Sequence, residues 1–519
     1  MKILTQEQLL LKAQEQFETM KQAILEFGQQ EVRIDQAEEY LFRDLQAIGL
    51  TMLESFAAAA GSGDEGQKVT RGERELKRSN ELKRRWYRSV FGKLAIFRWV
   101  YSRGPNKKIE YAPTDARLGL PKGEYSYLLE NWVGQASVKG PFEEAVEGIG
   151  AILGLQPSLE TAETINQRQA QYAEGFRLQQ PPPPSGTQES LLVVTADGTS
   201  VPMQTADRTG HPRSSTDAAN DHEDNQENDA SSPDMGSSPE VDDSADSEGS
   251  RRHGTTRRAY VGGVYSVEPF VRTPQDVLDE LSREAAAARR PRPQGKRLWA
   301  EMAADYEGSL TSGVERIFVE LAIDVEQRDP DRQKTLVALM DGERKLWDLQ
   351  QEWLGRSVQI LDFYHVMKRV RKVSKIVEPG NKSRREAWSS AQVSDLLAGK
   401  TSTVIRRWQR RLREAEGQGI WTDKQRRAVR SAIGYFKNNA DRMCYQEYLA
   451  SGYPIGSGVA EGGCRNAVKD RLDRTGMHWR FAGAQAMLVT RVLHLNGEWS
   501  EFIEYRIQRE QQSLYGTAA

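Results

Sequence analysis

Apolar side chains recur every three or four residues over 9–27, and a second pattern of this kind runs over 34–60. Spacing of this type is typical of helices that bury one face. Gly61-Ser62-Gly63 is expected to end the second helix, since glycine favours helix termini. The sequence therefore predicts an N-terminal helical region over residues 1–66.

The next region, 67–178, changes character twice. Val90–Tyr101 is rich in β-branched and aromatic residues around Gly92-Lys93 and follows a basic run, which predicts a hairpin. Helical periodicity returns over 126–171, with a tight break at Leu153-Gly154-Leu155 and Ser158 as the cap of the following helix. Two interpretations stay open, a DNA-binding helix-turn-helix or plain helix packing.

A run of prolines marks the main boundary. Pro181–Pro184 cannot continue a helix and should form a stiff spacer, so we assign residues 179–190 to a linker. Short apolar runs that resemble strands follow at 191–196, 260–267, 336–340 and 358–361. Helical patterns lie between them at 314–325 and 346–354, which predicts an α/β domain whose first part spans 191–365.

Two segments interrupt this domain. Residues 206–259 are polar, and 206–250 hold thirteen acids against two arginines. Such a segment cannot bury enough surface to offset its ordering entropy, so we expect a disordered acidic insertion between two strands. Residues 366–452 are predicted to be a basic helical insertion, since 366–430 contain 18 Lys or Arg and six acids. We assign 453–519 to the final helices of the core.

Composition and charge argue against several classes of protein. The net charge of −2 over 519 residues hides the acidic insertion, without which the chain is basic. No apolar stretch is long enough for a membrane span, and the first residues lack a secretory pattern. Cys444 and Cys464 are too few and too far apart for a disulfide framework or a cysteine zinc site. We expect a soluble cytoplasmic protein.

Three of the apolar runs end on an aspartate: Asp197, Asp341 and Asp362. Strands buried on both faces place such acids at the rim of the sheet, and the carboxyl ends of parallel strands are where ligands gather. Clustered carboxylates repel unless a cation offsets them, and hard oxygen ligands suit magnesium or manganese better than zinc. Alternatively, Asp197-Gly198 and Asp341-Gly342 are ordinary turn dipeptides.

A fourth acid follows a glycine-rich turn. The stretch 453–462 opens a helix in which Glu461 precedes Cys464 and Val468 by three and seven residues. This spacing predicts that Glu461 shares their apolar, inward-facing side, where it would need a partner such as a metal. The alternative role is an acid in the first turn that the helix dipole favours.

In this order the motifs resemble one family. Thr195-Ala196-Asp197-Gly198-Thr199, Met340-Asp341-Gly342, Leu361-Asp362-Phe363-Tyr364-His365 and Pro454 to Glu461 are similar to the Kra-type bacterial insertion-sequence transposases, which are related to the Mutator-like group. Val468-Lys469-Asp470-Arg471 and Gly476-Met477-His478-Trp479 extend the likeness. The resemblance covers about residues 90–500.

The resemblance implies an α/β RNase H-like catalytic core with an Asp, Asp, Glu triad, an all-helical insertion, and a mainly helical N-terminal DNA-binding region before it. Two Mg²⁺ ions, with Mn²⁺ as a substitute, would be held by Asp197, Glu461 and either Asp341 or Asp362. We favour Asp341, because its strand and Asp-Gly ending repeat the form of the first site. Asp362 and His365 then form an Asp-x-x-His signature. His365 would steady the scissile phosphate or pack a strand end.

The basic insertion is expected to contact phosphates, although a solvated helix surface is the alternative. Trp388 and Trp408 would add aromatic surface among these charges. The candidate DNA-binding residues are Lys368, Arg369, Arg371, Lys372, Arg384, Arg385, Arg406, Arg407, Arg410 and Arg411.

The implied function is a DDE-type DNA transposase that binds the terminal inverted repeats of its element, cuts them with a metal-activated water, and joins the freed 3′-hydroxyl to target DNA. Such a protein would be cytoplasmic, associated with the bacterial nucleoid, and a homo-oligomer on DNA. An RNase H-like structure-specific nuclease would share the acids but stop after hydrolysis. A transposase-derived DNA-binding regulator without catalysis is the third alternative.

Overall fold

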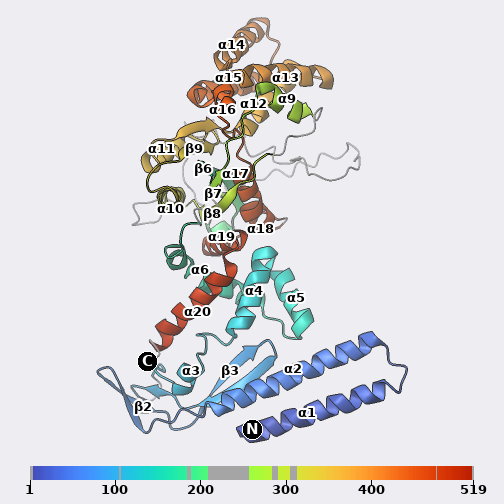
Figure 1. Cartoon of the computed structure of the whole chain (residues 1–519), viewed down its shortest axis with the longest axis vertical. Coiled ribbons are helices and arrows are strands. Elements are labelled where there is room, and N and C mark those ends of the chain that lie inside the picture. Colours follow the sequence, from blue (N-terminus) through green and yellow to red (C-terminus); the bar gives the residue numbers. More distant parts are fainter. Residues whose placement is uncertain are drawn as a thin grey trace. The chain divides into compact units, whose positions relative to one another are not determined.

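The computed structural model describes residues 4–104, 107–183, 189–207, 256–282, 290–303, 313–474 and 476–516. The chain divides into two compact units, one formed by Met1–Gln180 with Gly497–Ala519 and the other by Pro181–Asn496 (Figure 1). The division falls at the first proline of the run assigned to a linker. Most of the expected acidic insertion, residues 208–255, lies outside the described residues.

The first unit begins with the two predicted helices, α1 (Gln6–Phe27) and α2 (Ile34–Ala59), which pack against each other. Thr5 caps α1, because its hydroxyl accepts a hydrogen bond from the backbone N–H of Gln8. Both predicted helices are confirmed.

Five short strands follow, and the predicted hairpin is displaced. β1 (Lys68–Arg71), β2 (Arg74–Arg78) and β5 (Tyr101–Ser102) form one sheet, and β3 (Lys83–Ser89) pairs with β4 (Gly92–Arg98). The turn therefore lies at Val90-Phe91, and placing it at Gly92-Lys93 was wrong. The basic run forms β3 because Arg85 turns inward and pairs with Asp115 at 2.6 Å.

Helices α3 (Pro113–Arg117), α4 (Tyr127–Lys139), α5 (Phe142–Leu153), α6 (Leu159–Ala170) and α7 (Ala173–Arg177) complete the N-terminal part. The predicted break is confirmed, since Gly154 ends α5 at a φ of +64°. The predicted cap is confirmed as well, because the Ser158 hydroxyl accepts a hydrogen bond from the N–H of Thr161.

The last helix, α20 (Trp499–Tyr515), packs with α4 and α7 in the first unit. The sequence placed it in the core as part of 453–519. A buried ionic cluster accounts for its position: the Arg506 guanidinium lies 2.5 Å from Glu130 of α4 and 3.0 Å from Glu510. A buried charge of this kind requires its partners, so α20 cannot leave α4 without a large cost.

The second unit is built on a mixed five-stranded sheet of order β10-β9-β6-β7-β8. Its strands are β6 (Leu191–Pro202), β7 (Thr256–Val267), β8 (Gln294–Met302), β9 (Thr335–Met340) and β10 (Val358–Leu361). β6, β9 and β10 run parallel, whereas β7 is antiparallel to β6 and β8. Residues 256–259, expected in the insertion, belong to β7 and pair with β6.

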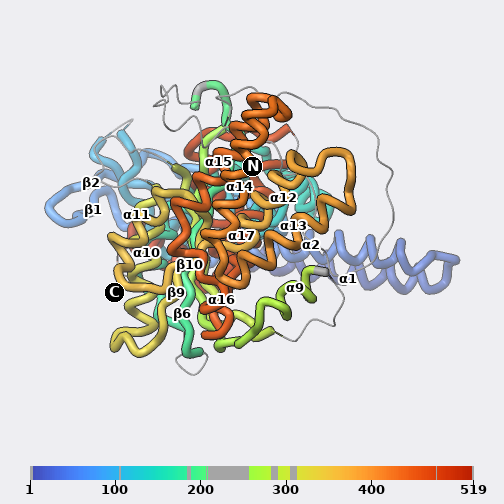
Figure 2. The backbone as a smooth tube through the Cα atoms, turned by 90° about the horizontal axis from the view of Figure 1, so that it is seen from above, coloured from blue at the N-terminus to red at the C-terminus, as the bar shows by residue number. Residues whose placement is uncertain are grey.

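Side chains of β6 alternate between two cores, which explains its continuous apolar run. Leu192 and Val194 face α10 (Gly313–Arg328) and α11 (Arg344–Trp353) on one side of the sheet. Leu191 and Val193 face the opposite core, which includes α12 (Phe363–Val377). Figure 2 shows α10 and α11 on one side of β6, β9 and β10, and α12, α13 and α16 on the other.

The predicted basic insertion is helical and begins with α12, directly after β10. It continues with α13 (Lys382–Leu397), α14 (Thr401–Gln418), α15 (Asp423–Asn438) and α16 (Tyr445–Ala450), and α9 (Pro274–Ser282) packs on α13. The chain then returns to the sheet through α17 (Gly458–Gly463), a π-helical turn (Cys464–Lys469), α18 (Asp470–Leu472) and α19 (Phe481–Leu495). Across the described parts of the chain, we find no helix with the length and apolar character that a membrane crossing requires.

Candidate active site

Asp197 and Asp341 lie at the same level of two neighbouring parallel strands. β6 and β9 are paired up to Val194 and Ala338, and each aspartate is three residues further on. Parallel strands keep this register, so the two carboxylates emerge side by side at the carboxyl edge of the sheet. Both residues are half-buried.

The electrostatics of Asp341 reflect this proximity. Burial raises the pKa of the Asp341 carboxyl, and the neighbouring Asp197 carboxylate raises it further, whereas His365 and Arg258 act in the opposite direction. A cation placed beside Asp341 would offset the repulsion from the neighbouring Asp197 carboxylate. Asp341 also accepts a hydrogen bond from the backbone N–H of Glu343 at 2.8 Å.

Asp362 follows the third parallel strand, but its oxygens are already engaged. It is only 1% exposed and caps α12 by accepting a hydrogen bond from the N–H of Tyr364 at 2.7 Å. Its other oxygen accepts from the hydroxyl and the N–H of Ser457, in the turn before α17. Burial alone would raise the pKa of Asp362, but His365 and Ser457 bring it below its usual range. The hydrogen bonds of Asp362 thus connect the start of α12 with the turn that precedes Glu461.

His365 is the cation of this group. Its Nδ1 lies 3.7 Å from the Asp362 carboxylate. Burial by itself lowers the pKa of His365, but Asp362, with smaller contributions from Asp341 and Asp197, outweighs burial and raises it to about 9. The imidazole is therefore protonated at neutral pH and faces the carboxylates.

Glu461 departs from its predicted orientation. Cys464 is 5% exposed and Val468 is fully buried, whereas the Glu461 side chain is 43% exposed and lies 3.7 Å from Lys368 of α12. The expectation that Glu461 shares their buried side was wrong, because α17 buries Ala460 and Gly463 and leaves Glu461 at the edge of its buried face. The helix itself reaches the site, since α17 packs on β6 and β7.

Several neighbours of the acids were not foreseen from the sequence. One of them is Cys464. Burial raises the pKa of its thiol, and the neighbouring Asp197 carboxylate raises that pKa further. Arg258 and Tyr260 of β7 donate hydrogen bonds to Glu343 at 2.7 and 2.8 Å. The polar residues that open β7 are the sequence signal of this network.

The glycines that follow the acids have packing roles. Gly198 lies within β6, so the turn interpretation of Asp197-Gly198 was wrong. A Cβ at Gly198 would lie 2.8 Å from the Tyr260 ring, and one at Gly342 would lie 2.2 Å from the Tyr435 ring. The Arg369 guanidinium lies over the Tyr435 ring, 4.5 Å from the ring centroid.

The donor set fits a hard divalent cation, because the two adjacent strand ends present carboxylate oxygens and no soft ligand other than a protonated thiol. Within the described ranges, no group of three His, Cys, Asp or Glu side chains is spaced to hold a metal ion. The structure thus brings Asp197 and Asp341 together, and holds Glu461 nearby on α17.

The candidate DNA-binding residues divide by helix. The four on α12 are Lys368, Arg369, Arg371 and Lys372, and this helix starts at the carboxylate edge of the sheet. On α13 and α14, acids of the insertion compensate part of the charge: Arg384 pairs with Glu378, Arg407 with Asp395, and both Arg410 and Arg411 with Glu414. Arg406 is exposed and Arg385 is half-buried.

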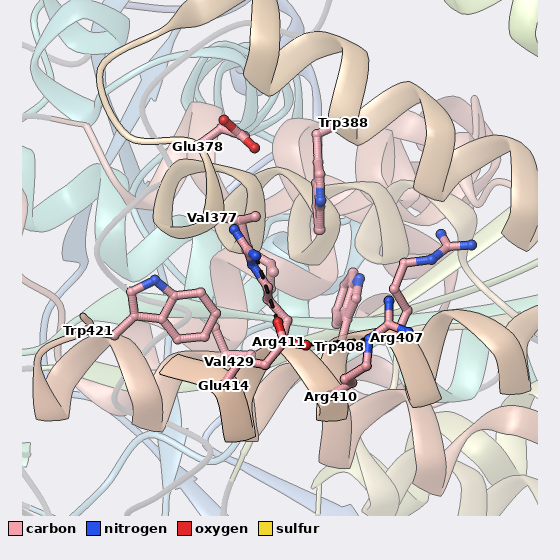
Figure 3. Close-up of a pocket in the computed structure, with 11 residues that line it drawn as sticks. Val377, Glu378, Trp388, Arg407, Trp408, Arg410, Arg411, Glu414, Trp421 and Val429 are labelled. Carbon is pink, nitrogen blue, oxygen red and sulfur yellow. Dashed lines mark ion pairs between the residues drawn. The ribbon is translucent and has the colours of Figure 1, made fainter. Parts of the chain in front are cut away.

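The tryptophans of the insertion belong to its core. Trp408 is 2% exposed and stacks on the half-buried Trp388 with ring centroids 5.8 Å apart. Together with Trp421 they line a cavity of about 280 Å³, which Arg407, Arg410 and Arg411 line as well (Figure 3). The expectation of aromatic surface was wrong for Trp408, which is buried where α13 and α14 pack together, whereas Trp388 is half-buried.

Comparison with known proteins gives no relative: no family model matches the chain, and no curated protein matches it.

Proposed function

We propose that this protein is a DDE-type DNA transposase with an RNase H-like core, as the resemblance of its motifs implies. The observation that carries the proposal is the pairing of Asp197 and Asp341 at the ends of adjacent parallel strands, with a raised pKa at Asp341. Three antiparallel strands followed by two parallel ones, with helices on both faces, are compatible with such a core.

Asp197, Asp341 and Glu461 are the residues that would hold magnesium. When bound, the metal would lower the pKa of an attacking water and stabilise the leaving oxygen at phosphorus. Asp362 is a positioning residue, because it fixes both the turn before α17 and the start of α12. Glu461 would complete the site by exchanging its exposed contact with Lys368 for the metal.

The chain's cations would hold the DNA. The protonated His365 faces the carboxylates and is suited to orient the scissile phosphate. The basic residues on α12 continue from the same edge of the sheet and would neutralise phosphates of the element end or the target. In this proposal the protein acts in the cytoplasm, at the bacterial nucleoid.

The test uses the full chain, magnesium, and duplex DNA from the inverted repeats that flank the gene. We expect Asp197→Asn and Glu461→Gln to reduce cleavage at least ~100-fold while end binding changes less than about twofold, since phosphate contacts come from other residues. Asp348→Asn is the matched control, because this carboxylate of α11 is 70% exposed and its ion-pair partner is the exposed Arg344.

Joining of the cut 3′ end to a target plasmid distinguishes a transposase from a structure-specific nuclease, which would leave nicks only. Full cleavage by either the Asp197→Asn or the Glu461→Gln variant would overturn the metal-site assignment.

A further inference from the structure

One face of the β3–β4 ribbon carries cations and aromatic rings. Residues that are directly opposite in an antiparallel pair point to the same face of the sheet, as does every second residue along a strand. On this face Arg84 is opposite Phe97, Trp86 is opposite Ala95, and Arg88 is opposite Lys93. Arg84 and Lys93 are exposed, and the other four residues are half-buried. We call these six side chains the ribbon face.

The opposite face of the ribbon is buried. Leu94 and Ile96 of β4 pack with Leu50 and Leu53 of α2. This contact holds the ribbon on the first unit, and the ribbon face is turned away from it.

The segment around the ribbon is strongly basic. Residues 67–103 contain twelve Lys or Arg and three acids, a net charge of +9. Some of these cations pair with acids, as Arg88 does with Glu124 at 3.2 Å. Arg84 and Lys93 form no ion pair with any acid in the described part of the chain. An excess of cations without counter-charges favours an anionic partner.

Trp86 holds these two cations in place. The Arg84 guanidinium lies 4.4 Å from the centroid of the Trp86 ring, and the Lys93 ammonium lies 3.9 Å from it. Cation–π contacts of this kind position both side chains before a partner binds, which lowers the entropy cost of binding. The ring is thereby already engaged, so the ribbon face suits the phosphates of a duplex better than the unstacked bases of a single strand.

Helices α5 and α6, the pair that the sequence left open as a helix-turn-helix, carry the opposite charge. Residues 142–170 contain five acids and one base, a net charge of −4 that phosphates would oppose. The base is Arg168, which pairs with the buried Glu130. Charge therefore favours the ribbon over these helices as the DNA contact of the first unit.

We propose that the ribbon face binds the phosphate backbone of duplex DNA through Arg84 and Lys93. A duplex presents phosphates at regular intervals, and contacts to them fix the position of a protein on DNA without selecting a sequence. The inference rests on the proposed function for DNA as the polyanion. It requires neither the carboxylates of the second unit nor a metal.

Fluorescence anisotropy of the full chain with a labelled random-sequence duplex, in EDTA and over a range of salt concentrations, tests the proposal. We expect Arg84→Gln/Lys93→Gln to weaken binding at least ~10-fold at low salt. The slope of log K against log salt concentration should decrease in magnitude by about 2, since two phosphate contacts are lost. Because both positions are exposed, circular dichroism should find the melting temperature unchanged.

Two matched variants sharpen the result. Lys21→Gln/Arg43→Gln removes two exposed cations of α1 and α2 that pair with Glu18 and Glu39, and it should keep the wild-type affinity and slope. Arg84→Lys/Lys93→Arg retains both charges of the ribbon face and should keep the wild-type slope as well.

Two results would overturn the inference: an Arg84→Gln/Lys93→Gln variant with the wild-type affinity and slope, or a wild type that prefers single-stranded DNA or RNA to the duplex. The proposed function fails separately, by the absence of cleavage in magnesium. A wild type that binds the duplex through the ribbon face but never cuts it would contradict the proposed function and leave this inference standing.

Discussion

At the scale of single residues, Asp341 and Asp362 show how similar motifs take different roles. Each follows an apolar strand, so the sequence left both open as the second ligand. The Asp362 oxygens accept hydrogen bonds from α12 and from Ser457, whereas Asp341 is paired with the like charge of Asp197. The distinction depends on Ser457, which is 95 residues away in sequence.

Replacing Asp362 should therefore affect stability. We expect Asp362→Ala to lower the free energy of unfolding by roughly 2 kcal/mol, since it removes a helix cap and leaves the Ser457 hydroxyl without its acceptor. Urea denaturation measures this value. Asp348→Ala, at an exposed position of α11, should change it by less than about 0.5 kcal/mol. An unchanged stability of Asp362→Ala would contradict the positioning role.

The raised pKa of His365 predicts a pH dependence of stability. The folded state holds this proton more tightly than the unfolded state, so the contribution is complete below the ordinary pKa of 6.5 and is lost as pH rises through about 9. In metal-free buffer, wild type should lose on the order of 2 kcal/mol more than His365→Gln between pH 6 and 10. His478→Gln, in an exposed turn, should retain the wild-type slope. Parallel profiles for wild type and His365→Gln would contradict the assignment.

At the scale of elements, the local sequence pattern was enough to predict a helix or strand where its apolar side chains form a regular run. The continuous runs of β6, β9 and β10 and the periodicity of α1 and α2 gave these elements their type and approximate bounds. β8 was missed because the charged residues Lys296 and Arg297 break its apolar run, and Arg297 pairs with the buried Asp324 of α10, which depends on tertiary contacts. The basic β3 was missed because its pairing with Asp115 depends on tertiary contacts.

The position of α20 could not be predicted from the local sequence pattern. It depends on an ion pair between two residues that are far apart in the sequence. We expect Arg506→Met to destabilise the first unit by roughly 3 kcal/mol, since it removes the counter-ion of Glu510 and one of the two arginines that pair with the buried Glu130, the other being Arg168. Thermal unfolding followed by circular dichroism measures the loss. Arg509→Met, at an exposed position of the same helix, should have little effect. Equal stability of the two variants would argue against the ionic cluster.

At the scale of the whole molecule, the acidic segment is predicted to be dispensable for chemistry. Pro202 of β6 is paired with Thr256 of β7, so the ends of the segment meet across one ladder and a short turn can join them. Replacing residues 208–252 with a short Gly-Ser linker should preserve cleavage within about twofold, because the entropy of closing a loop depends only weakly on its length. A drop of more than about 5 °C in melting temperature would contradict this.

The residue types of the candidate site could be predicted from the sequence, because three acids follow strand-like runs and one follows a glycine-rich turn. Their arrangement could not, because it depends on the strand order and on which side chains of α17 face the sheet. Trp408 was misplaced for a similar reason, since charged neighbours in sequence gave no sign of its burial.

Metal rescue tests the central claim most directly, namely that Asp341 contacts the metal that cuts DNA. Asp341→Cys and Asp362→Cys are each assayed for cleavage of the inverted-repeat duplex in magnesium and in manganese, which accepts sulfur better. We predict that Asp341→Cys is inactive in magnesium and regains at least ~10-fold in manganese, and that Asp362→Cys is not rescued selectively. Rescue confined to Asp362→Cys would contradict the account and make Asp362 the second ligand.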